Sequence, residues 1–278
     1  MKQPEAWAQH VRTIAATGRR PHFAPSDEIL TIQRERVSAF VASHGDGCLA
    51  VILGATPELA DIALMAGCRV VRIDCNPSMF ETAADRQIVA DRRNETILVG
   101  DWLHLDAIRD GEADIVLGDS SLNNVPHADM AKLFAELERI THAGSMLCLR
   151  QIVLPDKPVP AYEFPAALAA FRAGRITDDQ LHRMLRFYSF ATAAYDPQTF
   201  VLDARLVFAE IRRSYTAGLL RDAEYDFLMN RYSEIRHTIY ACSQQIRLLK
   251  GLGACEAMAP RLAGGPCELF KVFVVSVR

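Results

Sequence analysis

The chain has 278 residues and a mass of 30.9 kDa, and 50% of its residues are hydrophobic while 23% are charged. This composition excludes intrinsic disorder, collagen-like repeats and low-complexity polymers, and the length fits one large domain or two modest ones. A formal net charge of −3 argues against a general electrostatic grip on nucleic acid, so we expect no nucleic-acid partner.

The N-terminus and the cysteines both favour a cytoplasmic protein. Residues 1–10 contain Glu5 and Gln9 and lack the apolar core of a signal peptide. No apolar run approaches the length of a membrane span, so we expect no membrane association. The seven cysteines contain no Cys-x-x-Cys pair and have no histidines at zinc spacing, which predicts free thiols and no metal site.

The first stretch, residues 1–47, is polar and predicted to be helical. Ser26 followed by Asp27 and Glu28 is typical of a helix start, because the acids stand at the positive end of the helix dipole. Apolar residues then recur at near-helical spacing until residues 44–47, whose two glycines predict the helix end.

The second stretch, residues 48–154, alternates short apolar runs with helical segments. The runs predict five strands, at 49–53, 70–73, 96–99, 115–117 and 146–153. The segments between them predict helices at 58–66, 79–91 and 128–141. Alternating strands and helices form a parallel, doubly wound α/β sheet with helices on both faces, and such sheets bind ligands beyond the carboxyl ends of their strands.

The third stretch, residues 155–239, is predicted to be a helical cap. Three prolines at 155–160 break the chain after the fifth strand, and helices are expected at 181–194, 200–217 and 223–250. Two strand-like runs, 254–258 and 269–277, then flank Gly264 and Gly265. Because these runs return the chain to the sheet, the cap is predicted to be an insertion, with one core formed by residues 48–154 and 240–278.

Polar residues gather at the predicted carboxyl edge of the sheet. Gly54 follows the first strand, Asp74 ends the second, Asp101 follows the third and Asp119 follows the fourth. An acid at the end of the second strand is where a ribose diol is usually held, because a carboxylate accepts from two neighbouring hydroxyls. Each of these acids alone could be a helix cap or a solvated group, and Trp102, beside Asp101, could be a core residue. The inference of a ligand site therefore rests on their occurrence together at one edge of the sheet.

At this point the core resembles the class I S-adenosylmethionine-dependent methyltransferases. The resemblance rests on residues 51–59 (VILGATPEL), 71–80 (VRIDCNPSMF), 99–102 (VGDW) and 113–122 (ADIVLGDSSL), which look like the four successive motifs of that family. It covers about 48–154 and 240–278 and implies a Rossmann-like, seven-stranded sheet, mostly parallel, with an antiparallel C-terminal strand. One departure is that Leu53 stands where the family usually has an acid, and Gly54 is the only glycine of the first turn.

The resemblance implies S-adenosylmethionine as the cofactor and assigns roles to individual residues. Gly54 would let the backbone pass the cofactor and Thr56 would lie at its amino-acid end. Asp74 would hold the ribose, with the adenosine flanked by three residues of the same motif and the adenine framed by two of the next. The implied cofactor-binding residues are Gly54, Thr56, Asp74, Cys75, Asn76, Met79, Asp101, Trp102, Asp119 and Ser120.

Methyl transfer from a sulfonium is an in-line displacement that mainly needs alignment and exclusion of water. A base is required only when the acceptor must lose a proton, and our first candidates for catalysis are Asp119, His127 and Tyr188. The seven tyrosines all fall between residues 162 and 240, which predicts either an aromatic-packed subdomain or the wall of a pocket for a small apolar or planar acceptor. Tyr195, Tyr232 and His237 are further candidates from this stretch.

Three alternatives remain at this point. A nicotinamide dinucleotide enzyme is disfavoured because no Gly-x-Gly-x-x-Gly follows the first strand. A non-catalytic cofactor-binding partner or regulator is suggested by the missing acid at Leu53. An RNA or protein methyltransferase is disfavoured by the acidic balance. Exposed aromatic helices could pair two caps, so a homodimer is also possible.

Overall fold

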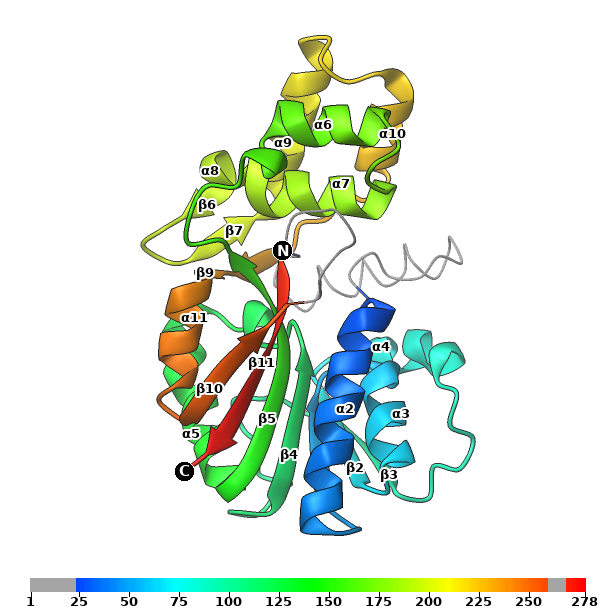
Figure 1. Cartoon of the computed structure of the whole chain (residues 1–278), viewed down its shortest axis with the longest axis vertical. Coiled ribbons are helices and arrows are strands. Elements are labelled where there is room, and N and C mark those ends of the chain that lie inside the picture. The colour runs from blue at the N-terminus through cyan, green and yellow to red at the C-terminus, as the bar shows by residue number, and fades with distance from the viewer. Residues whose placement is uncertain (1–23, 260–268) are drawn as a thin grey trace.

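The structure is a computed structural model that describes residues 24–259 and 269–278 (Figure 1). Its centre is a mixed sheet in the order β10-β11-β5-β4-β1-β2-β3, with a short β9 pairing with the end of β5. From β3 to β5 neighbouring strands are parallel, and β11 runs antiparallel to both β5 and β10. The strands are β1 (Leu49–Leu53), β2 (Arg69–Asp74), β3 (Glu95–Val99), β4 (Ala113–Asp119), β5 (Thr141–Leu154), β9 (Tyr240–Ala241), β10 (Gly253–Met258) and β11 (Phe270–Val277).

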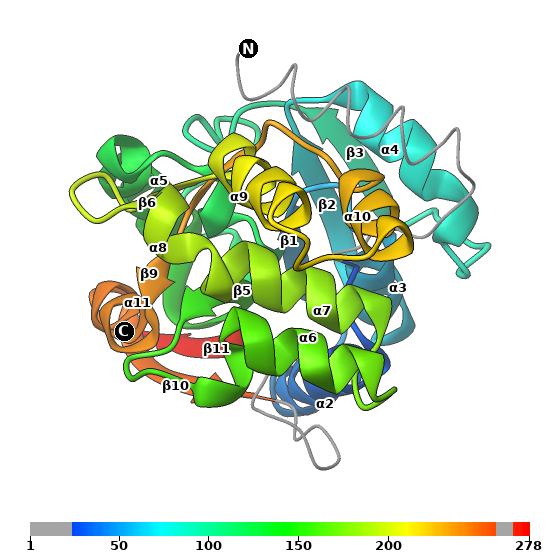
Figure 2. The ribbon, with the colours of Figure 1, turned by 90° about the horizontal axis from the view of Figure 1, so that it is seen from above.

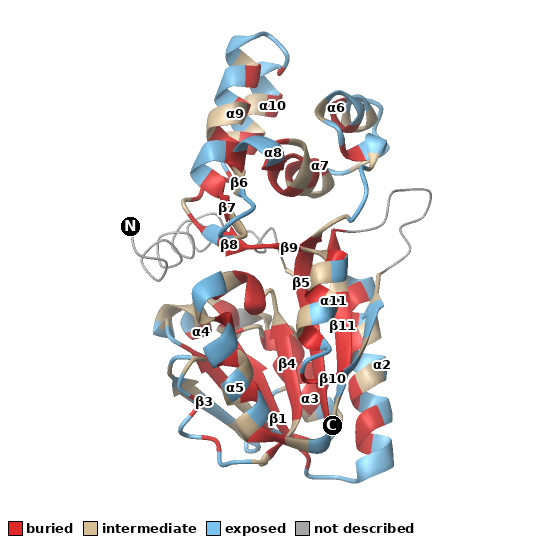
Figure 3. Ribbon diagram, turned by 90° about the vertical axis from the view of Figure 1, so that its left-hand side faces the viewer, coloured by how far each residue is buried: buried red, intermediate tan, exposed pale blue. Residues whose placement is uncertain are grey.

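Helices cover both faces of this sheet because its central strands are apolar on both sides. Ala50 and Ile52 of β1 pack with α2 and α3, whereas the alternate residues Val51 and Leu53 pack with α5 and α11. Figure 3 shows the resulting buried layer through the centre of the core. The covering helices are α2 (Asp27–His44), α3 (Pro57–Met65), α5 (Met130–Ile140) and α11 (Cys242–Leu249), and α4 (Pro77–Ala83) follows β2. The predicted doubly wound α/β fold with an antiparallel C-terminal strand is confirmed.

The cap stands over the carboxyl ends of the parallel strands (Figures 1 and 2) and has an apolar core of its own. Its helices are α6 (Phe164–Arg172), α7 (Asp178–Met184), α8 (Ala191–Ala194), α9 (Ala204–Thr216) and α10 (Asp222–Met229), with a π-helical turn over Leu185–Ser189. It also contains a three-stranded antiparallel sheet of β6 (Tyr195–Asp196), β7 (Val201–Asp203) and β8 (Arg236–Thr238).

Three helix predictions in the chain are corrected by the structure. Residues 223–250 form α10, β8, β9 and α11 instead of one helix, because the buried run around Ile235 and Ile239 is used in strand pairing. The segment 200–217 begins with a strand, Val201–Asp203, because these residues pair with β6 and β8. The helix expected at 79–91 ends by Arg86, because the Asp61 carboxylate accepts hydrogen bonds from the backbone of the next residues, 88 and 89.

The remaining predictions on organisation have mixed outcomes. Ser26 caps α2 as expected, and its hydroxyl accepts from the backbone N–H of Ile29. The predicted turn at Gly264 and Gly265 lies outside the described residues. The division into a core and an inserted cap stays a prediction. Within residues 24–259 and 269–278, we find no helix that is long and apolar enough to cross a membrane.

Candidate functional site

The turn after β1 brings Gly54, Asp74 and Trp102 together. Gly54 has a φ of +123°, which L side chains rarely adopt. A Cβ at Gly54 would lie 3.8 Å from Cζ2 of Trp102 and 3.9 Å from Oδ2 of Asp74. The indole of Trp102 is held in place because its Nε1–H donates to the carbonyl of Ile73 over 2.7 Å. A glycine turn, a carboxylate and an aromatic ring therefore share one place at the carboxyl edge, as the sequence predicted.

Asp74 is a buried carboxyl, and only one of its oxygens accepts a hydrogen bond from the described residues. The residue is 9% exposed, and its Oδ1 accepts the backbone N–H of Asn76 at 2.9 Å. Burial raises the pKa of Asp74 to about 6, and the Asn76 hydrogen bond opposes that rise only in part. The residue can thus accept hydrogen bonds from a ligand diol, but an unliganded protein bears a desolvation cost for keeping it charged.

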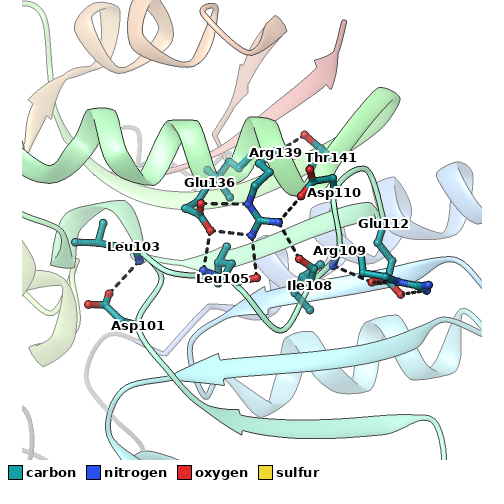
Figure 4. Close-up of polar contacts among 11 residues, drawn as sticks. Asp101, Leu103, Leu105, Ile108, Arg109, Asp110, Glu112, Glu136, Arg139 and Thr141 are labelled. Carbon is teal, nitrogen blue, oxygen red and sulfur yellow. Dashed lines mark hydrogen bonds and ion pairs between the residues drawn. The ribbon is translucent and has the colours of Figure 1, made fainter.

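Asp101 and Trp102 stand on the connection between β3 and β4, which contains no helix or strand in the described structure. Figure 4 shows how Arg139 of α5 anchors this connection, with guanidinium nitrogens donating to the carbonyls of Leu105 and Ile108 at 2.9 Å each. Glu136 accepts the backbone N–H of Leu105 at 2.7 Å. Asp101 itself is exposed and accepts the backbone N–H of Leu103 at 3.0 Å, which is a turn-forming contact.

The residues after Asp74 form the start of α4. The side chain of Asn76 caps this helix by accepting from the backbone N–H and the hydroxyl of Ser78, at 3.1 Å and 2.7 Å. The buried Nδ2 of Asn76 has no hydrogen-bond partner among the described residues. Met79 is half-buried and Cys75 is exposed beside Asp74. Thr56, the residue before α3, is half-buried and its hydroxyl makes no capping bond to that helix.

The turn after β4 is shaped by Asp119 and Ser120. Asp119 pairs in register with Arg150 of β5, and its Oδ1 accepts from Nη1 of that arginine. Ser120 has a φ of 56°, a strained value for a residue other than glycine, and its backbone N–H donates to the Arg150 carbonyl at 2.7 Å. Burial raises the pKa of Asp119, while the Arg150 charge and hydrogen bond act in the opposite direction.

The loop that follows, residues 121–129, is joined to the returning end of the cap. The Nδ2 of Asn123 donates to the carbonyls of Ile152 and Thr238, at 3.0 Å and 2.8 Å, and its Oδ1 accepts the Ile152 N–H at 2.9 Å. His127 is exposed, and its Nδ1 lies 2.7 Å from the hydroxyl of the buried Tyr240. This loop therefore links the end of β4 to both strands at which the cap leaves and rejoins the core.

The third catalytic candidate lies inside the cap. The hydroxyl of Tyr188 accepts the backbone N–H of Val159 at 2.7 Å, and its ring packs edge-on against Tyr162. Among the described residues, no hydrogen bond or ring contact joins Tyr188 to Asp119 or His127, so the three candidates are not brought together. In residues 24–259 and 269–278, no three histidine, cysteine or acidic side chains are grouped in a way that could hold a metal ion.

Sequence reasoning missed three residues at this edge, namely Arg150, Asn123 and Tyr240. Arg150 stands in the apolar run of β5, and only the strand register shows that it faces Asp119. Asn123 and Tyr240 gain their roles from contacts more than one hundred residues apart in the chain. The one available signal was the presence of a charged and an amide side chain at 150 and 151, within a strand otherwise expected to be buried and apolar.

The sequence is similar to known methyltransferases over part of its length. Residues 53–149 match a family model described as a methyltransferase domain. The demethylmenaquinone methyltransferase of Thermobifida fusca (strain YX) is 31% identical over 140 residues, which are 48% of this chain and 58% of that protein. The chain therefore spans less than two thirds of this curated relative.

Solved structures share the fold at low identity. A Rhodobacter sphaeroides protein described under zinc-dependent alcohol dehydrogenases aligns with a TM-score of 0.56 and 18% identity, over 99% of this chain and 98% of that one. A 1,6-didemethyltoxoflavin-N1-methyltransferase from Burkholderia thailandensis aligns with a TM-score of 0.51 and 12% identity, over 100% and 91% of the two chains. At these identities the likenesses establish the fold alone, over nearly the whole chain.

Proposed function

We propose that this chain is a class I S-adenosylmethionine-dependent methyltransferase and that it transfers a methyl group to a nucleophilic atom of a small molecule. The reaction would be an in-line displacement onto an oxygen, nitrogen or other nucleophilic atom. The observation that carries the proposal is the convergence of Gly54, Asp74 and Trp102 at the carboxyl edge of a sheet with this strand order.

The residues at the edge fit the cofactor. S-adenosylmethionine supplies an electrophilic methyl group on a positively charged sulfur. The glycine turn leaves room that a Cβ at Gly54 would take, and Asp74 keeps a carboxylate oxygen for the two ribose hydroxyls. The buried Nδ2 of Asn76, which has no partner among the described residues, would donate to an acceptor atom of the adenosine. The anchored indole of Trp102 would contact the adenine ring. The other cofactor contacts proposed from the sequence, at Thr56, Cys75, Met79, Asp101 and Ser120, stay predictions.

The catalytic contribution of the protein is proposed to be mainly alignment and water exclusion. Asp119 would orient groups at the reacting end, held by Arg150, and His127 stands on the loop that follows. Tyr188 would act only from the cap side, and its hydroxyl already accepts a backbone hydrogen bond. The variants His127→Ala and Tyr188→Phe therefore test whether either residue contributes to turnover beyond its structural contacts.

The acceptor is proposed to be small and either apolar or planar. Two observations support this class. The relative from Thermobifida fusca is a demethylmenaquinone methyltransferase, and aromatic side chains pack throughout the cap that covers the edge. We further propose that the protein works in the cytoplasm, because the described cysteines are free thiols, and that it can form a homodimer.

Calorimetry with S-adenosylmethionine and S-adenosylhomocysteine tests the cofactor assignment. We expect micromolar-range binding by the wild type and none by Asp74→Ala; equal binding by that variant would refute the assignment. Transfer of labelled methyl groups should then be screened with demethylmenaquinol and smaller naphthoquinols as acceptor probes. RNA and whole-protein substrates in the same screen test the macromolecular alternative, and a cofactor-bound structure whose sulfur faces a closed wall would favour the non-catalytic one.

A further inference from the structure

Arg150 is a fully buried arginine placed between two partners on neighbouring strands. Its side chain is 0% exposed. On one side it donates to Asp119 of β4, the residue directly opposite in the strand register. On the other side its Cζ lies 3.8 Å from the centre of the Phe270 ring of β11. Hydrogen bonding and cation–π contact together hold this guanidinium in one orientation.

Asp119 presents the negative end of this pair to the edge. Its side chain is 10% exposed, whereas the guanidinium behind it is not exposed at all. Both hydrogen bonds that the carboxylate accepts, from Arg150 and from the Ser120 hydroxyl at 3.4 Å, go to Oδ1. The second oxygen, Oδ2, is thus left without a hydrogen bond among the described residues. An ion pair whose cation is fully buried and whose anion is partly exposed has a directed field, although the pair is neutral overall.

Asp119 ends the strand next to the proposed cofactor turn. Leu53 and Gly118 are register partners on β1 and β4, so Gly54 and Asp119 are the next residues along two adjacent strands. The backbone of this turn is closely packed, because a Cβ at Gly118 would lie 2.3 Å from the Ser121 hydroxyl, and Ser120 has a left-handed backbone. The hydrogen bond from Arg150 holds the Asp119 carboxylate in this turn.

Arg150 also favours the charged form of Asp119, against burial and the nearby negative charge of Glu58. Burial acts to raise the pKa of Asp119, and the charge and hydrogen bond of Arg150 are the main influences that lower it. Without the guanidinium, the buried carboxyl would favour its protonated, neutral form. The direction of the field at the edge therefore depends on Arg150, although this side chain is itself out of reach of any ligand.

We infer that Arg150 is a positioning residue that, through Asp119, makes the protein discriminate between the cationic sulfur of S-adenosylmethionine and the neutral sulfur of S-adenosylhomocysteine. The inference rests on the proposed function. Methyl transfer removes the positive charge from the sulfur, so the attraction to Asp119 ends when the product forms. The same pair that favours the substrate cofactor thereby helps to release the spent one.

The test measures the dissociation constants of both compounds by calorimetry and compares their ratio between variants, without any methyl acceptor. We expect Arg150→Met to lower the preference for S-adenosylmethionine about tenfold, because Asp119 loses its charge. Asp119→Asn should lower it at least as much. Arg150→Lys should stay within about threefold of the wild type, because a cation remains behind the carboxylate. The matched control is Arg36→Met, which removes an arginine of α2 that pairs with Glu256 of β10 at 2.9 Å.

The outcomes separate the two claims. An unchanged ratio in Arg150→Met, or in Asp119→Asn, overturns the inference while leaving cofactor binding intact. Failure of the wild type to bind either compound refutes the proposed function and the premise of the inference with it. Thermal unfolding shows whether Arg150→Met is folded; if it is not, the ratios of Asp119→Asn and Arg150→Lys decide, and a large loss in the lysine variant alone counts against the inference.

Discussion

Replacing Asp74 by asparagine should stabilise the unliganded protein while abolishing cofactor binding. Because burial raises the pKa of Asp74 from 3.8 to about 6, and each pKa unit corresponds to about 1.36 kcal/mol, keeping this carboxyl charged costs about 3 kcal/mol. Asparagine retains the side-chain oxygen that accepts from the backbone of Asn76 and carries no charge to desolvate. The free energy of unfolding, measured with urea at pH 8, should therefore rise by up to about 3 kcal/mol.

The pH dependence checks the cause. The folded state binds the Asp74 proton more tightly than the unfolded state, so wild-type stability should fall as pH rises from about 4 to 6. The advantage of Asp74→Asn should accordingly shrink to roughly half at pH 5 and nearly vanish at pH 3.5. Asp106→Asn, at an exposed position, is the control and should change little. A variant that is no more stable than the wild type at pH 8, or whose advantage is independent of pH, would refute the reasoning.

Three further predictions concern the same edge. Trp102→Phe loses the indole N–H that donates to Ile73 and should weaken S-adenosylhomocysteine binding about tenfold in calorimetry, whereas unchanged affinity would make the indole a packing residue only. Asn123→Ala removes three buried hydrogen bonds and should lower the free energy of unfolding in urea by about 3 kcal/mol; a loss below about 1 kcal/mol would contradict the role of Asn123 in joining cap and core. Tyr240→Phe should lower the free energy of unfolding by about 1 kcal/mol in the same assay. The double variant with His127→Ala should lose little more, because both substitutions remove the same hydrogen bond.

The core could be predicted from the sequence because its local signals agree with its tertiary structure. The apolar, β-branched runs at 49–53 and 96–99 became strands, and Gly54 and Asp101, which follow them, fell at the expected edge. Asp74 was predictable for this reason, since a strand end fixes where the next side chain stands. The return of the strand at 269–277 to the sheet could be foreseen from its apolar residues, whereas its antiparallel direction was implied by the family resemblance.

The cap was harder to predict because its elements depend on pairing between distant segments. The run from 235 to 240 has apolar residues at a spacing compatible with a helix, yet it is used as β8 and β9 against β7 and β5. Periodicity alone does not distinguish these outcomes in a short apolar run. The role of Arg150 was hidden for a related reason, since its partner Asp119 is defined only once the two strands are in register.

The place where the cap joins the core has a consequence for how proteins of this fold diversify. The chain leaves the core beyond Val153 and returns at Tyr240, and these two residues are neighbours in a parallel pair. The two ends of the 86-residue segment between Val153 and Tyr240 therefore lie side by side. Because the entropy of closing a loop grows only slowly with its length, a cap of different size or sequence could be exchanged here at small cost. The segment between β5 and β9, which we propose to face the substrate, is therefore free to change while the sheet edge that holds Asp74 and Asp119 keeps its shape.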